Sequence, residues 1–212
     1  MLKKKLFTAA AIAVGLLIAS PAADAAHKRD TKVKAKVALG AKKVTAAAKK
    51  PVKATVAAAP CTNTDVMPTA ENLELVRAAI LCLHNQIRTQ AGLPGLKDNA
   101  KLRKAALGQS NDMVANGYFD HTSLEGDTFV DRILAAGYAK RNDGWTLGEN
   151  LAWGTGDLST AQGVMNAWMN SAGHKANIVK KAYREVGIGI RLGVPTDEGV
   201  GATITADFGV KL

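Results

Sequence analysis

The spacing of apolar residues predicts a long helix at the start of the region 61–212. Five apolar residues recur there at steps of three and four: Leu73, Val76, Ile80, Leu83 and Ile87. This spacing places them on one face of a helix over about residues 71–90. Gly92 and Pro94 follow and end it.

Three further helices are predicted from caps and breakers. Asp98 or Asn99 can cap a second helix, which ends near Gly117. A short third helix is expected over residues 128–136, capped by Asp127. Residues 159–162 have the form of a capping box, which predicts a helix that continues to near Gly173.

The last part of the chain follows a different period. Apolar residues alternate with other residues over 186–192 and again over 200–208, and turn-forming residues 195–199 lie between the two runs. Period two on both sides of a turn predicts an antiparallel hairpin. Helices around a small antiparallel sheet make an α+β layered domain the expected fold class.

The first 60 residues have a different character. Lys3, Lys4 and Lys5 precede an apolar run of 14 residues, 6–19, and small residues follow at 23–25. This order is typical of a cleaved export signal over residues 1–25, and the run is shorter than the roughly 20 residues that span a bilayer. We therefore expect no transmembrane segment in the mature chain.

Residues 26–60 are rich in Ala and Lys and contain no aromatic residue. Too little bulky apolar area is present to offset the entropy of ordering, so a disordered tether is expected. It would either be a solvated linker or adhere to anionic envelope polymers or lipid head groups.

The positive charge of the chain is confined to this first part. Of the 28 Lys and Arg residues, 13 lie in residues 1–60 with only 2 acidic residues, whereas residues 61–212 carry 15 against 16. The globular region is therefore close to neutral. A basic nucleic-acid-binding domain is excluded on this ground.

The chain contains two cysteines, Cys61 and Cys82, and both follow the export signal. An oxidising compartment favours a disulfide between them, with a pair of buried thiols as the alternative. A bridge that closes about 20 residues stabilises a fold by on the order of 3 kcal/mol in the chain-entropy model.

Several segments together resemble the CAP superfamily of cysteine-rich secretory, antigen 5 and pathogenesis-related proteins, in its bacterial form. They occur in the family's order at 83–88 (LHNQIR), 118–123 (YFDHTS), 148–152 (GENLA), 168–178 (WMNSAGHKANI) and 186–189 (VGIG). The resemblance covers about residues 70–212. It implies an α-β-α sandwich for a domain over residues 61–212, in a protein that is secreted or held in the cell envelope.

The resemblance also implies a cleft lined by two histidines and two acidic residues, which binds a divalent cation in some members. By position, His121 and His174 are similar to the histidines, and Glu149 is similar to the first acid. The eukaryotic members carry a glutamate three residues after the residue that corresponds to Trp168. Here that position is Ser171, so the chain departs from the family at the second acid.

The chemistry of these residues can be weighed apart from the family. Two imidazoles and one carboxylate form the ligand set of open zinc sites, and they suit zinc better than calcium. His121, Glu149 and His174 are therefore candidate zinc ligands. Alternatively, His121 could satisfy carbonyls at a helix end and Glu149 could accept amide hydrogen bonds in a loop. Trp153 could form a wall of the cleft.

Three functions remain open. The first is a secreted binding module for a small apolar or envelope-derived ligand, as the lipid-binding relatives imply. The second is a zinc-dependent hydrolase of peptide or envelope polymer. The third is an envelope-adhesion protein that binds through residues 26–60. The sequence contains neither HExxH nor GxSxG, and bridged cysteines are not nucleophiles, so a binding module is favoured over an enzyme.

Overall fold

The computed structural model describes residues 60–196 and 199–212. The predicted export signal, and all of the predicted tether except Pro60, lie outside the described residues. Within the described part, none of the helices combines the length and the apolar character that crossing a bilayer requires.

A four-stranded sheet forms the centre of the described region, in the order β1-β3-β4-β2. The predicted hairpin is confirmed: β3 (Glu185–Leu192) and β4 (Gly201–Lys211) are antiparallel, with Ile188 opposite Ala206. The strand β2 (Trp145–Thr155) pairs antiparallel with β4 along its whole length and forms one edge.

The sheet differs from the prediction in two respects. β1 (Lys97–Asp98) pairs parallel with β3, so the sheet is mixed and not purely antiparallel. Moreover, the interpretation of Glu149 as a loop residue is wrong, since it lies in the middle of β2. The residues of β2 do not alternate between apolar and polar, because both faces of this strand are partly covered.

The predicted helices are present. They are α1 (Leu73–Gln90), α2 (Ala100–Asn116), α3 (Phe129–Ala135) and α4 (Ala161–Asn170). Three boundaries are corrected. The cap of α4 is Thr160, whose side chain accepts from the Gly163 amide, and not Ser159 as the predicted capping box requires. The cap of α3 is Thr128, not Asp127, because its side chain accepts from the Asp131 amide in a reciprocal capping box. α4 ends at Asn170, after which the chain bends at Ser171 and begins α5 (Ala172–Ile178).

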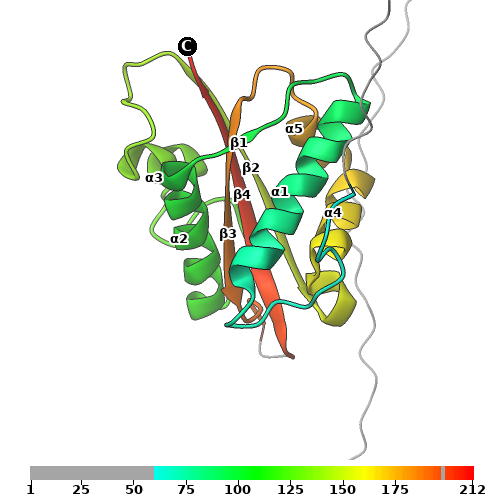
Figure 1. Ribbon diagram of the computed structural model, residues 1–212. Coiled ribbons are helices and arrows are strands. Elements are labelled where there is room, and N and C mark those ends of the chain that lie inside the picture. Colours follow the sequence, from blue (N-terminus) through cyan, green and yellow to red (C-terminus); the bar gives the residue numbers. More distant parts are fainter. Residues whose placement is uncertain (1–59, 197–198) are drawn as a thin grey trace, which may run out of the picture. The chain divides into compact units, whose positions relative to one another are not determined.

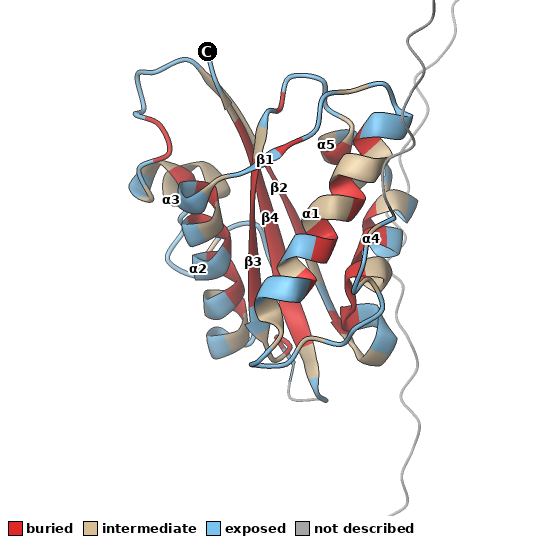
Figure 2. Cartoon of the chain, viewed as in Figure 1, coloured by how far each residue is buried: buried red, intermediate tan, exposed pale blue. Residues whose placement is uncertain are grey.

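The helices cover both faces of the sheet, as Figure 1 shows, with α1, α4 and α5 on one side and α2 and α3 on the other. The α-β-α sandwich is therefore confirmed. Figure 2 shows that the strands and the inward faces of the helices are buried. The main apolar core lies under α1 and α4 and includes Trp168, Ile188, Ile204, Ala206 and Phe208.

On the opposite face of the sheet, α2 packs so closely on β3 that only glycine fits at two positions of the strand. A Cβ atom at Gly187 would overlap the backbone of Arg103, and one at Gly189 would overlap the backbone of Leu107. The backbone of α2 therefore rests directly on β3. Beside this contact, the hydroxyl groups of Ser110 and Thr205 are hydrogen bonded at 2.9 Å, which joins α2 to β4.

Two features fix the first helix. Cys61 and Cys82 form the predicted disulfide, which ties the start of the domain to α1. At the other end of α1, the guanidinium of Arg88 is buried and donates to four backbone carbonyls, those of Pro94, Ile178, Lys180 and Tyr183. This one side chain connects α1 to the segments that surround α5.

Candidate functional site

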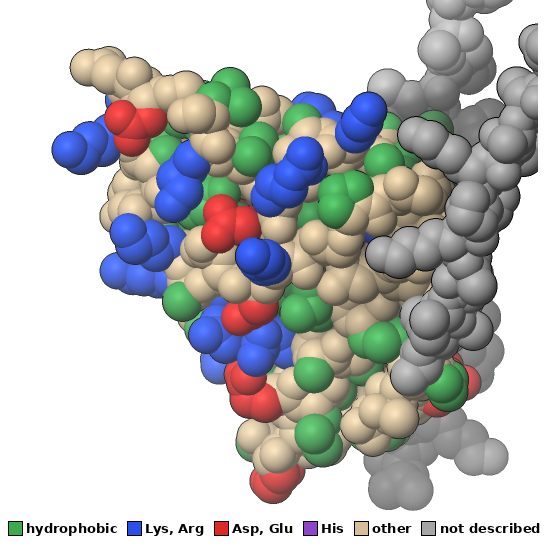
Figure 3. Space-filling view, turned by 45° about the horizontal axis from the view of Figure 1, so that its top comes forward, with side chains coloured by type: hydrophobic (Ala, Val, Ile, Leu, Met, Phe, Trp, Pro, Cys, Tyr) green, Lys and Arg blue, Asp and Glu red, His purple; other side chains and the backbone are tan. Residues whose placement is uncertain are grey.

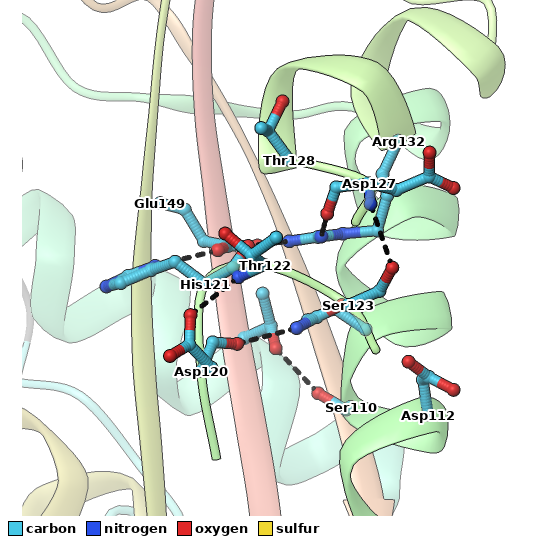
Figure 4. Close-up of polar contacts among 12 residues, drawn as sticks. Ser110, Asp112, Asp120, His121, Thr122, Ser123, Asp127, Thr128, Arg132 and Glu149 are labelled. Carbon is cyan, nitrogen blue, oxygen red and sulfur yellow. Dashed lines mark hydrogen bonds and ion pairs between the residues drawn. The ribbon is translucent and has the colours of Figure 1, made fainter. Parts of the chain in front are cut away.

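The candidate site is centred on Glu149, whose side chain is fully buried although it lies on an edge strand. His121 Nδ1 lies 2.8 Å from Glu149 Oε1, and Arg132 Nη2 lies 2.8 Å from Glu149 Oε2. Because a carboxylate oxygen only accepts, the His121 nitrogen is the donor. Both oxygens of Glu149 thus have a nitrogen donor (Figure 4).

Arg132 belongs to α3 and fastens the loop that carries His121. Its Nη2 also donates to the His121 carbonyl at 3.0 Å, and its Nη1 donates to the Asp127 carbonyl at 2.8 Å. The capping box at Thr128 fixes the start of α3 and so the position of Arg132. The loop is further held where Gln109 donates to the Asp120 carbonyl at 2.7 Å.

His121 is the exposed member of this group, with half of its side chain accessible. The hydrogen bond that His121 donates to Glu149 raises the pKa of the His121 imidazole above its usual value. Partial burial opposes this, and the negative charges of Glu149 and Asp120 add to it. The ring is therefore oriented through Nδ1, which leaves Nε2 for a ligand.

Asp207 lies beneath the site, directly opposite Glu149 in the β2–β4 ladder. It is fully buried, no donor group of the described structure reaches its carboxyl oxygens, and its polar neighbour is the carboxyl group of Glu149. Burial raises the pKa of the Asp207 carboxyl well above its usual range, and the negative charge of Glu149 raises it further. Two acidic groups therefore share one buried face, and Asp207 favours its neutral form.

His174 reaches the same strand from the other face of the sheet. It lies in α5, and its carbonyl accepts a hydrogen bond from Asn150 Nδ2 at 3.1 Å. Asn177, also in α5, donates to the Glu149 carbonyl and to Asn150 Oδ1 at 3.1 and 2.9 Å. Burial lowers the pKa of His174, and the charge of nearby His121 lowers it further.

Direct coordination by all three predicted zinc ligands finds no support in this geometry. The described residues contain no group of three or more His, Cys, Asp or Glu side chains placed to hold a metal ion. Glu149 uses both oxygens within the protein. The pair of Glu149 and His121 has instead the form of a carboxylate that orients a metal-binding histidine, and zinc binding stays a prediction.

The remaining candidate residues have separate positions. Trp153 follows Glu149 by four residues on the same face of β2 and is 41% exposed. Ser171 lies between α4 and α5 and its side chain makes no capping hydrogen bond. His84 is buried beside the rings of Trp168 and Phe208 and packs in the core.

Sequence reasoning missed Arg132, Asp207 and Asn177. Arg132 resembles any exposed helix residue in the sequence, and its role depends on the loop that folds over it. Asp207 occupies an alternate position of β4, which would face solvent if only one face of the sheet were covered. The small residues Gly187, Gly189 and Thr205 were the available signal that a helix covers this second face.

The fold and these residues together define the class. The chain matches the cysteine-rich secretory protein (CAP) family over residues 81–199 and belongs to that family. Two curated relatives come from Bacillus subtilis (strain 168): the uncharacterized protein YkwD is 36% identical over 107 residues, and the uncharacterized membrane protein YlbC is 34% identical over 111. These matches cover 50% and 52% of this chain but only 39% and 30% of the relatives' lengths.

Solved structures agree with the fold. An extracellular protein containing a SCP domain from Bacillus anthracis str. Ames is 27% identical with a TM-score of 0.51, over 66% of this chain and 43% of that one. An outer surface protein from Borrelia burgdorferi is 23% identical with a TM-score of 0.51, over 69% of this chain and 97% of that one. The second likeness concerns the fold alone.

Proposed function

We propose that this protein is a secreted binding module that engages an envelope-derived ligand at the β2 edge, through His121, His174 and Trp153. Secretion is supported by the disulfide, which persists in oxidising compartments. It is also supported by the extracellular protein of Bacillus anthracis, to which the chain is similar.

The observation that carries this proposal is the engagement of Glu149. Its two oxygens are each 2.8 Å from a donor, one on His121 and one on Arg132, and its side chain is fully buried. A carboxylate in this state orients its neighbours and is not free to act as a base or nucleophile. What the site offers to a ligand is an oriented imidazole, a second imidazole nearby and an exposed indole.

These groups suit a ligand with both polar and apolar parts. His121 Nε2 and His174 can donate to hydroxyl, amide or anionic oxygens, and Trp153 can stack on an apolar ring or chain. If a divalent cation is bound, His121 and His174 are the residues that would hold it, and Glu149 would keep His121 in position. The cation would supply a Lewis-acidic contact for a ligand oxygen.

Cosedimentation of the full chain with isolated peptidoglycan and with vesicles of anionic lipid tests the proposal. We expect His121→Ala and Trp153→Ala to reduce the bound fraction at least fivefold, and Leu75→Ala, which truncates an exposed apolar side chain on α1, to leave it unchanged. Equal binding by all four proteins would refute the proposal.

The same assay separates the alternatives. Adhesion through residues 26–60 predicts that their deletion, or high salt, abolishes binding while His121→Ala does not. A zinc-dependent hydrolase predicts release of soluble fragments from peptidoglycan, inhibited by a chelator. Calorimetric titration with zinc chloride shows whether the metal binds and whether His121→Ala prevents it.

A further inference from the structure

The opposite edge of the sheet has an unpaired stretch of strand. β1 contains two residues and pairs only with Glu185 and Val186 of β3. From Gly187 to Leu192, no strand of the described region lies against the outer edge of β3. In Figure 1 this strand is seen in the gap between α1 and α2, below β1.

The register shows which backbone groups face this edge. Lys97 and Asn99 donate to the carbonyls of Arg184 and Val186, both at 2.9 Å, whereas the Gly193 amide donates to Gly201 at 2.8 Å on the β4 side. The backbone N–H and C=O groups of successive residues in a strand point to opposite neighbours. Those of Ile188 and Ile190 therefore point away from β4, toward the unpaired edge.

These outward groups are buried without a partner. Ile188 is 1% exposed and Ile190 is 6% exposed. Neither residue hydrogen bonds to any described group outside the β3–β4 ladder. Buried backbone donors and acceptors are almost always paired, because leaving them unpaired costs about 1–3 kcal/mol each. The edge therefore has the capacity to bind another backbone.

A groove of about 390 Å³ lies along this edge, between α1 and α2. Its walls are mainly apolar, with Leu73 from α1 and Leu107 from α2, and its rim carries three arginines and one glutamate: Arg77, Arg103, Arg191 and Glu74. Arg77 and Arg103 lie near Glu74 and Asp98. Arg191 is exposed and has no acidic group within 4.0 Å among the described residues, and it adds a positive charge to the rim of the groove.

Basic and acidic side chains are otherwise mixed over the neighbouring surface, as Figure 3 shows. The positive charge of Arg191 therefore acts locally and is not part of a large basic surface. An occupant recognised here would combine apolar side chains, a free backbone edge and a nearby negative charge.

We propose that this groove binds an extended acidic peptide, which adds to β3 as a strand in line with β1. Its backbone would pair with Ile188 and Ile190, alternate side chains would contact Leu73 and Leu107, and a carboxylate would lie at Arg191. About five residues, or roughly 17 Å of strand, suffice to cover positions 188–192. An acyl chain would fill the apolar walls but would leave the backbone groups unpaired.

Selection from a phage-displayed library of random heptapeptides on the full chain tests this site. Leu107→Glu places a charge on the groove wall, and Asn111→Trp fills the groove from the exposed side of α2. Leu124→Glu is the matched control, at an exposed position outside the groove. We expect the enriched clones to be rich in acidic residues and to bind the wild type and Leu124→Glu equally. They should bind both groove variants at least tenfold more weakly, and they should also bind Arg191→Glu more weakly than the wild type.

Spectra of ¹⁵N-labelled protein with the strongest synthetic peptide then locate the backbone contact. The amide protons of Ile188 and Ile190 should shift downfield. Two further peptides are N-methylated, one at the odd and the other at the even positions, and only the one whose methylated amides face β3 should lose binding. The proposal is overturned if no clone is enriched, if the groove variants bind normally, or if both N-methylated peptides bind like the parent. The histidine site lies on β2 at the other edge, so His121→Ala serves as an independent control here.

Discussion

Glu149 and Asp207 face each other across the β2–β4 ladder, and only one of these two buried acidic groups has hydrogen-bond donors. Glu149 is bound by His121 and Arg132, whereas Asp207 has no such partner in the described structure. The pair therefore combines a carboxyl group that is held by two nitrogen donors with one whose pKa burial raises.

Asp207→Asn should change how stability depends on pH. The pKa of Asp207 is raised in the folded state, so its favourable contribution is complete below the unfolded pKa of 3.8 and is lost as pH rises through the folded pKa. The free energy of unfolding of the variant, relative to the wild type, should therefore increase with pH. Urea denaturation across the acidic and neutral range measures this difference, and a constant difference would contradict the prediction.

Glu149→Gln should lower the pKa of His121, because the hydrogen bond that His121 donates to the Glu149 carboxylate is the main cause of its elevation. Asp120→Asn should lower it less, since Asp120 acts only through its charge. NMR titration of the imidazole protons measures both values. An unchanged His121 pKa in Glu149→Gln would show that the pair does not persist in solution.

His84 should make the protein less stable in mild acid. Burial lowers the pKa of its imidazole to about 4. The contribution of the neutral ring is present above the unfolded pKa of 6.5 and is lost as pH falls toward 4, by roughly 3 kcal/mol in total. His84→Leu should remove this loss between pH 6.5 and 4. Chemical denaturation at both ends of the interval compares the variant with the wild type.

Arg88→Leu should destabilise the fold by at least about 3 kcal/mol, because it leaves four carbonyls without their donor, and two of these, on Ile178 and Tyr183, are in buried hydrogen bonds. Arg88→Lys keeps the charge but offers fewer donors in a different geometry, so an intermediate loss is expected. Thermal and urea unfolding give the two values. Equal stability of the leucine variant and the wild type would mean that water replaces the guanidinium.

The sequence predicted the helices and the hairpin well because their apolar periods and caps are local. Leu73 to Ile87 mark α1, Asn99 caps α2 as one of two expected residues, and Gly117 ends that helix with a positive φ of 66°. The strand β2 was not predicted, because both of its faces are partly covered. Its apolar residues therefore follow neither the helical period nor the period of two of a half-buried strand.

The sequence predicted which residues form the candidate site, but not which groups they are hydrogen bonded to. His121 and Glu149 are in contact, and His174 approaches from α5, but sequence spacing could not show that Arg132 occupies the second oxygen of Glu149. Such a contact depends on the tertiary path of residues 117–128. The burial of Asp207 could not be predicted either, because it results from the tertiary packing of α2 against the sheet.

The position of β2 has a consequence for folding. Consecutive residues of this strand serve opposite sides of the molecule: Glu149 turns toward His121 and Arg132, while Asn150 turns toward α5. A slip of a single residue against β4 would exchange the two sides and bury an amide where the carboxylate belongs. Assembly of the ligand-facing groups and correct alignment of this edge strand are thus one event, so the His121–Glu149 contact reports directly on native pairing.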